Sequence, residues 1–145
     1  MAELWEKCRA GKVEEVREAL QAGADPNTRG GRDYTTGLME ASMRDNHELV
    51  GLLLSSPGID INAKDEYNYT ALHLACFSGS LASISQLLAT DGLQLNERTI
   101  TGFTPLMIAV SYGQTKAVRL MAAKAAVSLD VRDEEGRSLE DIANW

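Results

Sequence analysis

The sequence predicts an all-α repeat solenoid, a stack of antiparallel helix pairs with projecting hairpin loops. First, similar segments recur at a spacing of 34 positions, which aligns Thr36, Thr70, Thr104 and Ser138, and likewise Ala41, Ala75, Ala109 and Ala143. Second, each threonine or serine precedes a short apolar run, as the N-cap of a helix does. Third, a further run follows with apolar residues three and four apart. A fixed period of this length is typical of a solenoid whose units bury their apolar faces against their neighbours.

The copy that begins at Thr104 shows the unit most clearly. Thr104 suits the N-cap, and Pro105 suits the first helical position, where its missing N–H costs nothing. Leu106 and Ala109 share one helical face, and Gly113 supplies the left-handed backbone for a turn into a second helix. Polar, extended segments connect successive units, and we expect each to turn back through a tight hairpin, at Asn68, Gly102 and Gly136.

These units resemble the ankyrin repeat. Residues 70–75 (Thr-Ala-Leu-His-Leu-Ala) and 104–109 (Thr-Pro-Leu-Met-Ile-Ala) are similar to the family's Thr-Pro-Leu-His-x-Ala signature, and residues 22–27 are similar to its Ala-Gly-Ala-Asp-x-Asn ending. The resemblance runs from about residue 4 to about residue 143. It implies L-shaped layers of helix pairs and hairpins, and a role in binding other proteins rather than in catalysis.

The resemblance also implies roles for single residues. His73 falls on the signature histidine, whose implied role is hydrogen bonding between repeats. Asn62 and Asn96 resemble asparagines that can be hydroxylated in this family, although the ordinary interpretation is that they hold the hairpin base through backbone hydrogen bonds.

We divide the chain as a single ankyrin-like repeat domain, 1–145. Its units are an N-terminal capping repeat at about 1–29, then 30–64, 65–98 and 99–132, and a partial C-terminal repeat at 133–145. The cap begins with a helix that is more charged than its later counterparts. Its second helix, about residues 13–20, keeps Val16 and Leu20 on one face and turns an acidic face to water.

The second unit departs most from the pattern. One extra residue enters near Gly30 and Gly31, and Tyr34 replaces the turn residue of the later hairpins. Because tyrosine takes a positive φ poorly, we expect a remodelled hairpin in which the glycine pair provides the freedom that Tyr34 lacks. Asp45 replaces the helix-ending glycine, which aspartate tolerates. Glu40 stands at an otherwise apolar position, and we expect it to pair with Arg44 one turn away.

The fifth unit supplies a hairpin and a first helix but no second helix. Two interpretations stay open: an adapted terminal cap, or a chain that belongs to a longer protein. If Ile142 and Trp145 seal the C-terminal face, we expect a monomer. If they leave apolar surface bare, we expect stacking on further repeats or on a second copy.

Composition and motifs exclude several function classes. The formal net charge of −7 argues against nucleic acid or an anionic membrane as partner, and no apolar run suggests membrane insertion. Cys8 and Cys76 occupy unrelated positions, which favours an intracellular setting, cytoplasmic or nuclear. His47, His73 and Cys76 make no recognisable metal site, and no phosphate-binding loop or nucleophile elbow occurs. We therefore expect no enzyme activity, no catalytic residue, no metal and no cofactor.

The predicted function is a protein–protein interaction module of the adaptor or inhibitor type, which docks a partner on its concave hairpin and first-helix surface. The alternative is a scaffold or self-assembly segment excised from a larger protein. Candidate contacts form two sets. The first, which we call the basic column, recurs at spacings of 35, 34 and 34 positions just before each hairpin: Arg29, Lys64, Arg98 and Arg132. The second, the aromatic group, lies in the hairpins and near the ends of first helices: Tyr67, Tyr69, Phe77, Ile100, Phe103 and Tyr112.

Aromatic anchors flanked by arginine are enriched at interface hot spots. The expected ligand is an extended or helical protein segment that carries acidic residues around one or two apolar anchors. A structural interpretation of the basic column stays open, in which Lys64 pairs with Asp65, or Arg132 with Asp133.

Overall fold

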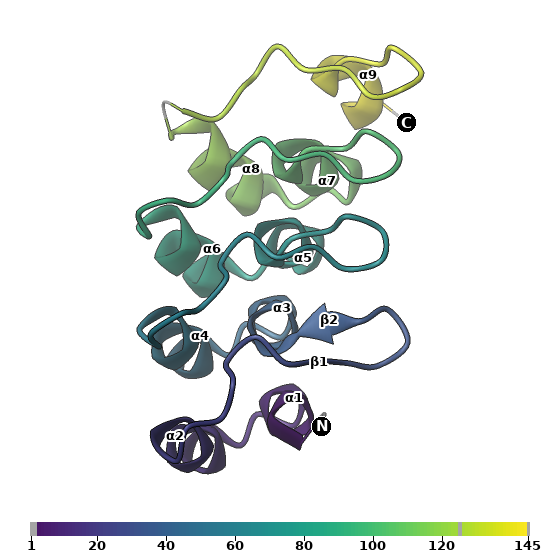
Figure 1. The fold of residues 1–145 in the computed structure, drawn as a ribbon. Helices are drawn as coiled ribbons and strands as arrows, with labels where there is room; N and C mark the ends of the chain where they lie inside the picture. Colours follow the sequence, from purple (N-terminus) through teal and green to yellow (C-terminus); the bar gives the residue numbers. More distant parts are fainter. Residues whose placement is uncertain (1–2, 125, 145) are drawn as a thin grey trace.

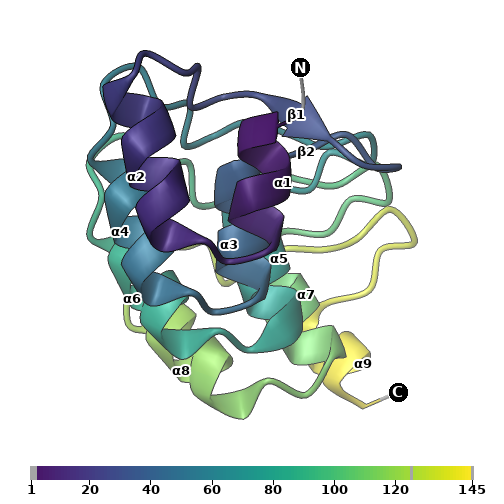
Figure 2. The same ribbon diagram turned by 90° about the horizontal axis from the view of Figure 1, so that it is seen from below.

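The computed structural model describes residues 3–124 and 126–144 as helix pairs stacked in layers (Figure 1). The helices are α1 (Glu3–Arg9), α2 (Val13–Gln21), α3 (Gly37–Met43), α4 (His47–Leu54), α5 (Ala71–Ser78), α6 (Leu81–Leu88), α7 (Pro105–Ser111), α8 (Thr115–Ala122) and α9 (Leu139–Ala143). Helices α1, α3, α5 and α7 form one row, and α2, α4, α6 and α8 form a second row beside it (Figure 2). The hairpins project from the side of the first row. The predicted all-α repeat solenoid is confirmed.

Each first helix begins where the sequence indicates. The side chains of Thr36, Thr70, Thr104 and Ser138 each accept a hydrogen bond from the amide three residues later. That third residue accepts in return from the amide of the capping residue, so two otherwise unpaired N–H groups are satisfied together. The acceptor is a methionine sulfur in α3 and α7, a histidine nitrogen in α5 and an aspartate oxygen in α9.

The ends of these helices also follow the sequence prediction. Gly79 and Gly113 have φ values of 71° and 67°, and Asp45 takes the same conformation with φ of 53°. Asp45 does more than tolerate the turn, because its carboxylate accepts from the amide and the hydroxyl of Ser83 in the next layer, at 3.0 and 2.9 Å. The residue that replaces glycine thereby joins two layers.

The core is a ribbon that runs through the stack. Helix α3 packs against α5, and α5 against α7. The leucine and the alanine of each signature are buried where these helices meet: Leu38, Leu72, Leu106, Ala41, Ala75 and Ala109. At the C-terminal end, Ile142 of α9 is buried against Met107 and Val131, which covers part of α7. Trp145, the other residue expected at this face, lies outside the described residues.

The first hairpin contains a two-stranded antiparallel sheet, β1 (Arg29–Gly30) and β2 (Thr35–Thr36). The expectation that Tyr34 avoids a positive φ is wrong: its φ is 58°, close to that of Asn68 at 62°. The guanidinium of Arg29 holds this conformation, because it donates to the Tyr34 carbonyl at 2.9 Å and lies over the Tyr34 ring.

The two glycines of the first hairpin are needed for two different physical reasons. Gly31 has a positive φ of 75°, as expected, but Gly30 is required for space. A Cβ atom on Gly30 would overlap the indole ring of Trp5, which packs against the hairpin from the N-terminal cap. The indole N–H donates to the Thr35 hydroxyl at 2.9 Å, and that hydroxyl donates to the buried carboxylate of Glu40. Glu40 also pairs with Arg44 at 2.6 Å, which confirms the predicted ion pair.

Asparagine side chains tie the extended segments of successive layers together. Asn27, Asn62 and Asn96 each donate to a carbonyl in the next layer, of Gly58, Gly92 and Ala126 respectively. Each side-chain oxygen also accepts from an amide two residues beyond that carbonyl. The expected backbone hydrogen bonds of Asn62 and Asn96 are thus present, but they join neighbouring layers instead of holding the base of a hairpin. Among the described residues, no helix has the length and apolar character needed to cross a bilayer.

Candidate partner-binding groove

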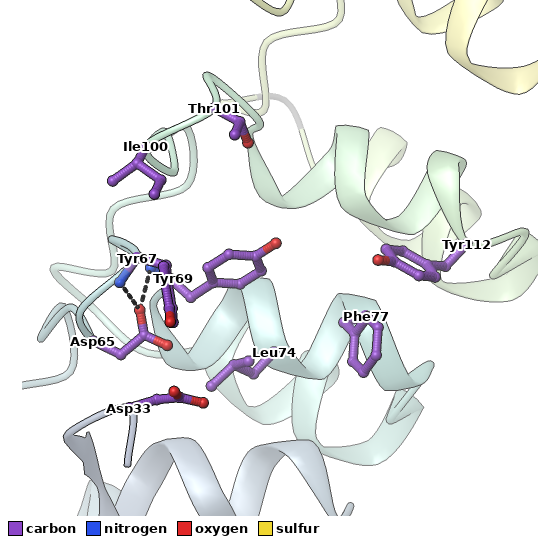
Figure 3. Close-up of a pocket in the computed structure, with 9 residues that line it drawn as sticks. All are labelled: Asp33, Asp65, Tyr67, Tyr69, Leu74, Phe77, Ile100, Thr101 and Tyr112. Carbon is purple, nitrogen blue, oxygen red and sulfur yellow. Dashed lines mark hydrogen bonds between the residues drawn. The ribbon is translucent and has the colours of Figure 1, made fainter.

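A groove of about 350 Å³ opens between the hairpins and the first helices in the middle of the stack (Figure 3). Its lining comes from three successive hairpins, from α5 and from the end of α7. The lining residues are Asp33, Asp65, Tyr67, Tyr69, Leu74, Phe77, Ile100, Thr101 and Tyr112. Five of the six residues of the predicted aromatic group therefore line one groove.

Backbone hydrogen bonds hold the hairpins at this spacing. The carboxylate of Asp65 accepts from the amides of Tyr67 and Tyr69, at 2.8 and 2.9 Å, which shapes the second hairpin. The tips are then joined to one another: the Glu66 amide donates to the Asp33 carbonyl, and the Ile100 amide donates to the Tyr67 carbonyl, at 3.1 and 3.0 Å. The groove is therefore preformed, because its walls are fixed without a ligand.

The wall of the groove is apolar and open to water. The exposed fractions of Tyr67, Phe77, Ile100 and Tyr112 are 45%, 39%, 53% and 54%. Phe77 and Tyr112 meet edge to face, with ring centroids 4.6 Å apart, and join the end of α5 to the end of α7. Tyr69 is more deeply placed, with its ring 5.6 Å from the imidazole of His73. Large apolar side chains that stay exposed together on one face mark an interaction site.

Phe103 differs from the rest of the aromatic group. It does not line the groove, and it packs half-buried against the core of the stack. Its carbonyl accepts from Nε2 of His73 at 3.0 Å, while Nδ1 of His73 accepts from the Thr70 amide. This confirms the role in hydrogen bonding between repeats expected for His73, and it gives Phe103 a structural place. Burial lowers the pKa of His73 to about 4, although its bond to the Phe103 carbonyl opposes that shift.

The basic column lies at the base of the hairpins and outside the lining of the groove. Arg29 and Arg98 each bridge two carbonyls, one in their own hairpin and one in the next repeat, of Lys64 and Arg132 respectively. Arg132 donates to the carbonyl of Gly136. These cations are engaged as staples of the stack.

The pairings suggested for the basic column are wrong. Lys64 pairs with Glu97 of the next repeat, at 2.6 Å, and not with Asp65. Asp133 pairs instead with Arg137 and accepts from two hairpin amides. Burial opposes its ionisation, but these bonds hold the pKa of Asp133 below its usual value. Adjacent residues in extended backbone point to opposite sides, so Lys64 does not meet Asp65 and Arg132 does not meet Asp133.

Sequence reasoning missed four lining residues: Asp33, Asp65, Leu74 and Thr101. A signal was present, since Asp33, Tyr67 and Thr101 each precede the turn residue of a hairpin and so stack in one column. Burial raises the pKa of Asp65; the Tyr67 and Tyr69 amides and Arg29 oppose that shift, and the charge of Asp33 adds to it.

The side chains that could act as nucleophiles or metal ligands have structural surroundings instead. Burial raises the pKa of the Cys8 and Cys76 thiols to about 12, so both are protonated at neutral pH. Within residues 3–124 and 126–144, no cluster of three or more His, Cys, Asp or Glu side chains converges as a metal site would.

A family model for ankyrin repeats, with three copies, matches residues 4–99 and 38–133. The chain belongs to the ankyrin repeat family. The helix pairs, hairpins and asparagine links described above are thus those of an ankyrin stack, and ankyrin repeats are protein–protein interaction modules.

Two curated relatives share part of this stack. The chain is 42% identical over 52 residues to the human SMC5-SMC6 complex localization factor protein 1, which is 36% of this chain and 5% of that protein. It is 35% identical over 72 residues to the Arabidopsis thaliana E3 ubiquitin-protein ligase KEG, which is 50% of this chain and 4% of that ligase. The chain thus spans only a small fraction of the length of these relatives.

Proposed function

We propose that this ankyrin repeat chain docks a segment of a partner protein in the groove between its hairpins and first helices, as an adaptor or inhibitor without catalytic activity of its own. The single observation that carries the proposal is the set of half-exposed apolar side chains gathered in a preformed groove, namely Tyr67, Phe77, Ile100 and Tyr112. Aromatic side chains supply large contact area at low conformational cost, so they suit a docking surface.

The geometry supports one half of the ligand predicted from the sequence. An apolar anchor fits the exposed Phe77–Tyr112 pair and the neighbouring Leu74. The acidic half loses its support, because the guanidinium groups of Arg29 and Arg98 are already bound to backbone carbonyls. We also propose an intracellular setting, which the two free, buried thiols of Cys8 and Cys76 support.

The test is a selection of short random peptides from a display library against the whole chain. Selected peptides should bind through the groove, so Ile100→Ala and Tyr112→Ala should each weaken them about fivefold to thirtyfold, mainly through faster dissociation. Leu129→Ala is the matched control, because Leu129 is equally exposed but lies outside the groove. Circular dichroism would check that all three variants stay folded.

Two results would overturn this proposal. One is that no peptide is selected; the other is that the selected peptides bind both groove variants as well as they bind the unaltered chain.

A scaffold or self-assembly role is the second candidate, and the exposed Leu129 favours it. This side chain lies beyond α8, near the C-terminal end of the stack, where its exposed fraction is 55%. Sedimentation velocity over a range of concentrations tests the idea. A dimer that dissociates in the Leu129→Ser variant would support self-assembly, whereas a monomer at all concentrations would contradict it.

A further inference from the structure

Two carboxylates lie at one end of the groove, on hairpins that come from successive repeats. In Figure 3 the side chains of Asp33 and Asp65 lie at the hairpin end, Phe77 and Tyr112 lie at the other end, and Leu74 lies between them. Asp65 is 9% exposed and uses one oxygen to accept both hairpin amides. No bond to the second oxygen, or to the side chain of Asp33, occurs within the part of the chain that the structure describes.

The two carboxylates also lack a cationic partner among the described residues. Arg29 is near enough to Asp65 to influence it, yet its guanidinium is bound to the carbonyls of Tyr34 and Lys64. Lys64 points to Glu97 instead. Asp33 and Asp65 therefore repel each other, and neither forms an ion pair with a described residue, an arrangement that a bound cation would relieve.

The walls beside these carboxylates suit a cation as well. Tyr67 and Tyr69 line the groove next to Asp65, and the faces of tyrosine rings attract ammonium and guanidinium groups. Leu74 and the Phe77–Tyr112 pair continue the groove as an apolar track. A long side chain with an apolar stem and a charged head fits this groove, since its stem covers the apolar track while its head reaches the carboxylates.

We propose that the hairpin end of the groove accepts a lysine or arginine side chain of the partner segment, with Asp33 and Asp65 as its counter-charges. This inference rests on the proposed function and names the chemistry of the ligand. It reverses the sign of the charge expected from the sequence. The formal net charge of −7 on the whole chain agrees with a basic partner, because it attracts one over longer distances.

The closing experiment uses the peptides selected against the whole chain and retained by the groove. We expect arginine or lysine at one position in most of them, a few residues from an aromatic or aliphatic anchor. Replacing that arginine by citrulline, or that lysine by norleucine, keeps the length of the side chain and removes its charge. The affinity should fall about fivefold to tenfold, and the difference should shrink as salt is added.

The protein side of the test is a pair of matched variants. Asp33→Asn should weaken the basic peptides about threefold to tenfold and leave their citrulline or norleucine forms unchanged. Glu66→Gln removes the same charge from an exposed residue at the same hairpin level, outside the groove lining, and should leave both forms unchanged.

The outcomes separate this inference from the proposed function. Groove-dependent peptides without a preferred basic residue, or basic peptides equally affected by Asp33→Asn and Glu66→Gln, would overturn the cation subsite and leave the docking groove in place. Selection of acidic peptides would restore the ligand expected from the basic column. Absence of any groove-dependent peptide would remove both proposals together.

Discussion

At the scale of the residue, one position shows how different side chains serve the same backbone group. The third residue of each first helix accepts from the amide of the capping residue, and it is Met39, His73, Met107 or Asp141. His73 alone among these four also donates to the next repeat, through its bond to the Phe103 carbonyl. The bond from the Thr70 amide to Nδ1 requires a neutral ring, so protonation of His73 opposes folding.

His73→Met should make stability less dependent on pH. The pKa of His73 is about 4 in the folded chain and 6.5 for the ordinary side chain, so the unfolded state binds the proton more readily. Stability is then full above pH 6.5 and falls as the pH drops towards 4, by about 3 kcal/mol from this group. Methionine does not titrate, and Met39 and Met107 already occupy this position.

Urea unfolding of both chains between pH 7 and pH 4 measures the effect. The unaltered chain should lose more stability over this range than the His73→Met variant. The variant should be less stable at pH 7, because it lacks the bond to the Phe103 carbonyl. Parallel curves would show that the buried imidazole contributes nothing to the pH dependence.

At the scale of the element, arginine side chains add to the backbone bonds that close the hairpins. β1 and β2 pair over two residues on each side, and the later hairpins are each closed by a backbone bond, from the amides of Asp65, Thr99 and Asp133 to the carbonyls of Tyr69, Phe103 and Arg137. Arg98 is the clearest case, since its Nη1 donates to the carbonyls of Gly102 and Arg132 at 2.6 and 2.7 Å. A single planar group thereby closes one hairpin and fixes its distance from the next.

Arg98→Lys should lower the free energy of unfolding by about 1–2 kcal/mol, because the shorter lysine side chain does not place its nitrogen where Nη1 bridges the two carbonyls. Lys64 shows the alternative, since lysine at this place pairs with Glu97 instead. Arg119→Lys, on the exposed side of α8, is the matched control and should change stability little. Urea denaturation measures the free energy of unfolding of both variants. Equal losses in Arg98→Lys and Arg119→Lys would contradict the role of Arg98 in joining the two hairpins.

At the scale of the whole molecule, stability depends on position in the stack. Helix α5 packs between α3 and α7, whereas α9 packs mainly against α7. In a linear array each repeat is stabilised by its own fold and by contacts with its immediate neighbours. A helix in the middle of the stack therefore has two interfaces to lose, and the last helix has one.

Leu72→Ala should cost about 2–5 kcal/mol and speed amide hydrogen exchange through the stack, because it opens a cavity at both interfaces of α5. Leu139→Ala, in the first turn of α9, should cost less and speed exchange mainly in α9. Hydrogen exchange followed by NMR distinguishes the two patterns. A faster exchange of α1 in Leu139→Ala would mean that the stack unfolds as one unit, and would contradict the linear description.

The sequence alone determined the repeat, the helix limits and the family. These features are local: the caps Thr36, Thr70, Thr104 and Ser138 act within four residues, and Gly79 and Gly113 act on their own turn. It also identified five of the lining residues, because exposed aromatics on hairpins have no place in a core. It misplaced Phe103, whose burial depends on the neighbouring repeats.

Only the tertiary structure decided what the basic column and the two carboxylates of the groove do. Arg29, Lys64 and Arg98 look alike in the sequence, yet each finds its partner in the following repeat, 33 to 35 positions away. Asp33 and Asp65 are 32 positions apart and meet because successive hairpins stack. Tyr34 takes a positive φ because Arg29 holds its carbonyl. Local propensity sets the helices, because it depends on residues a few positions apart. The partner of a charged side chain depends on which residues the stacked repeats bring close in space, and the order of residues along the chain does not give that proximity.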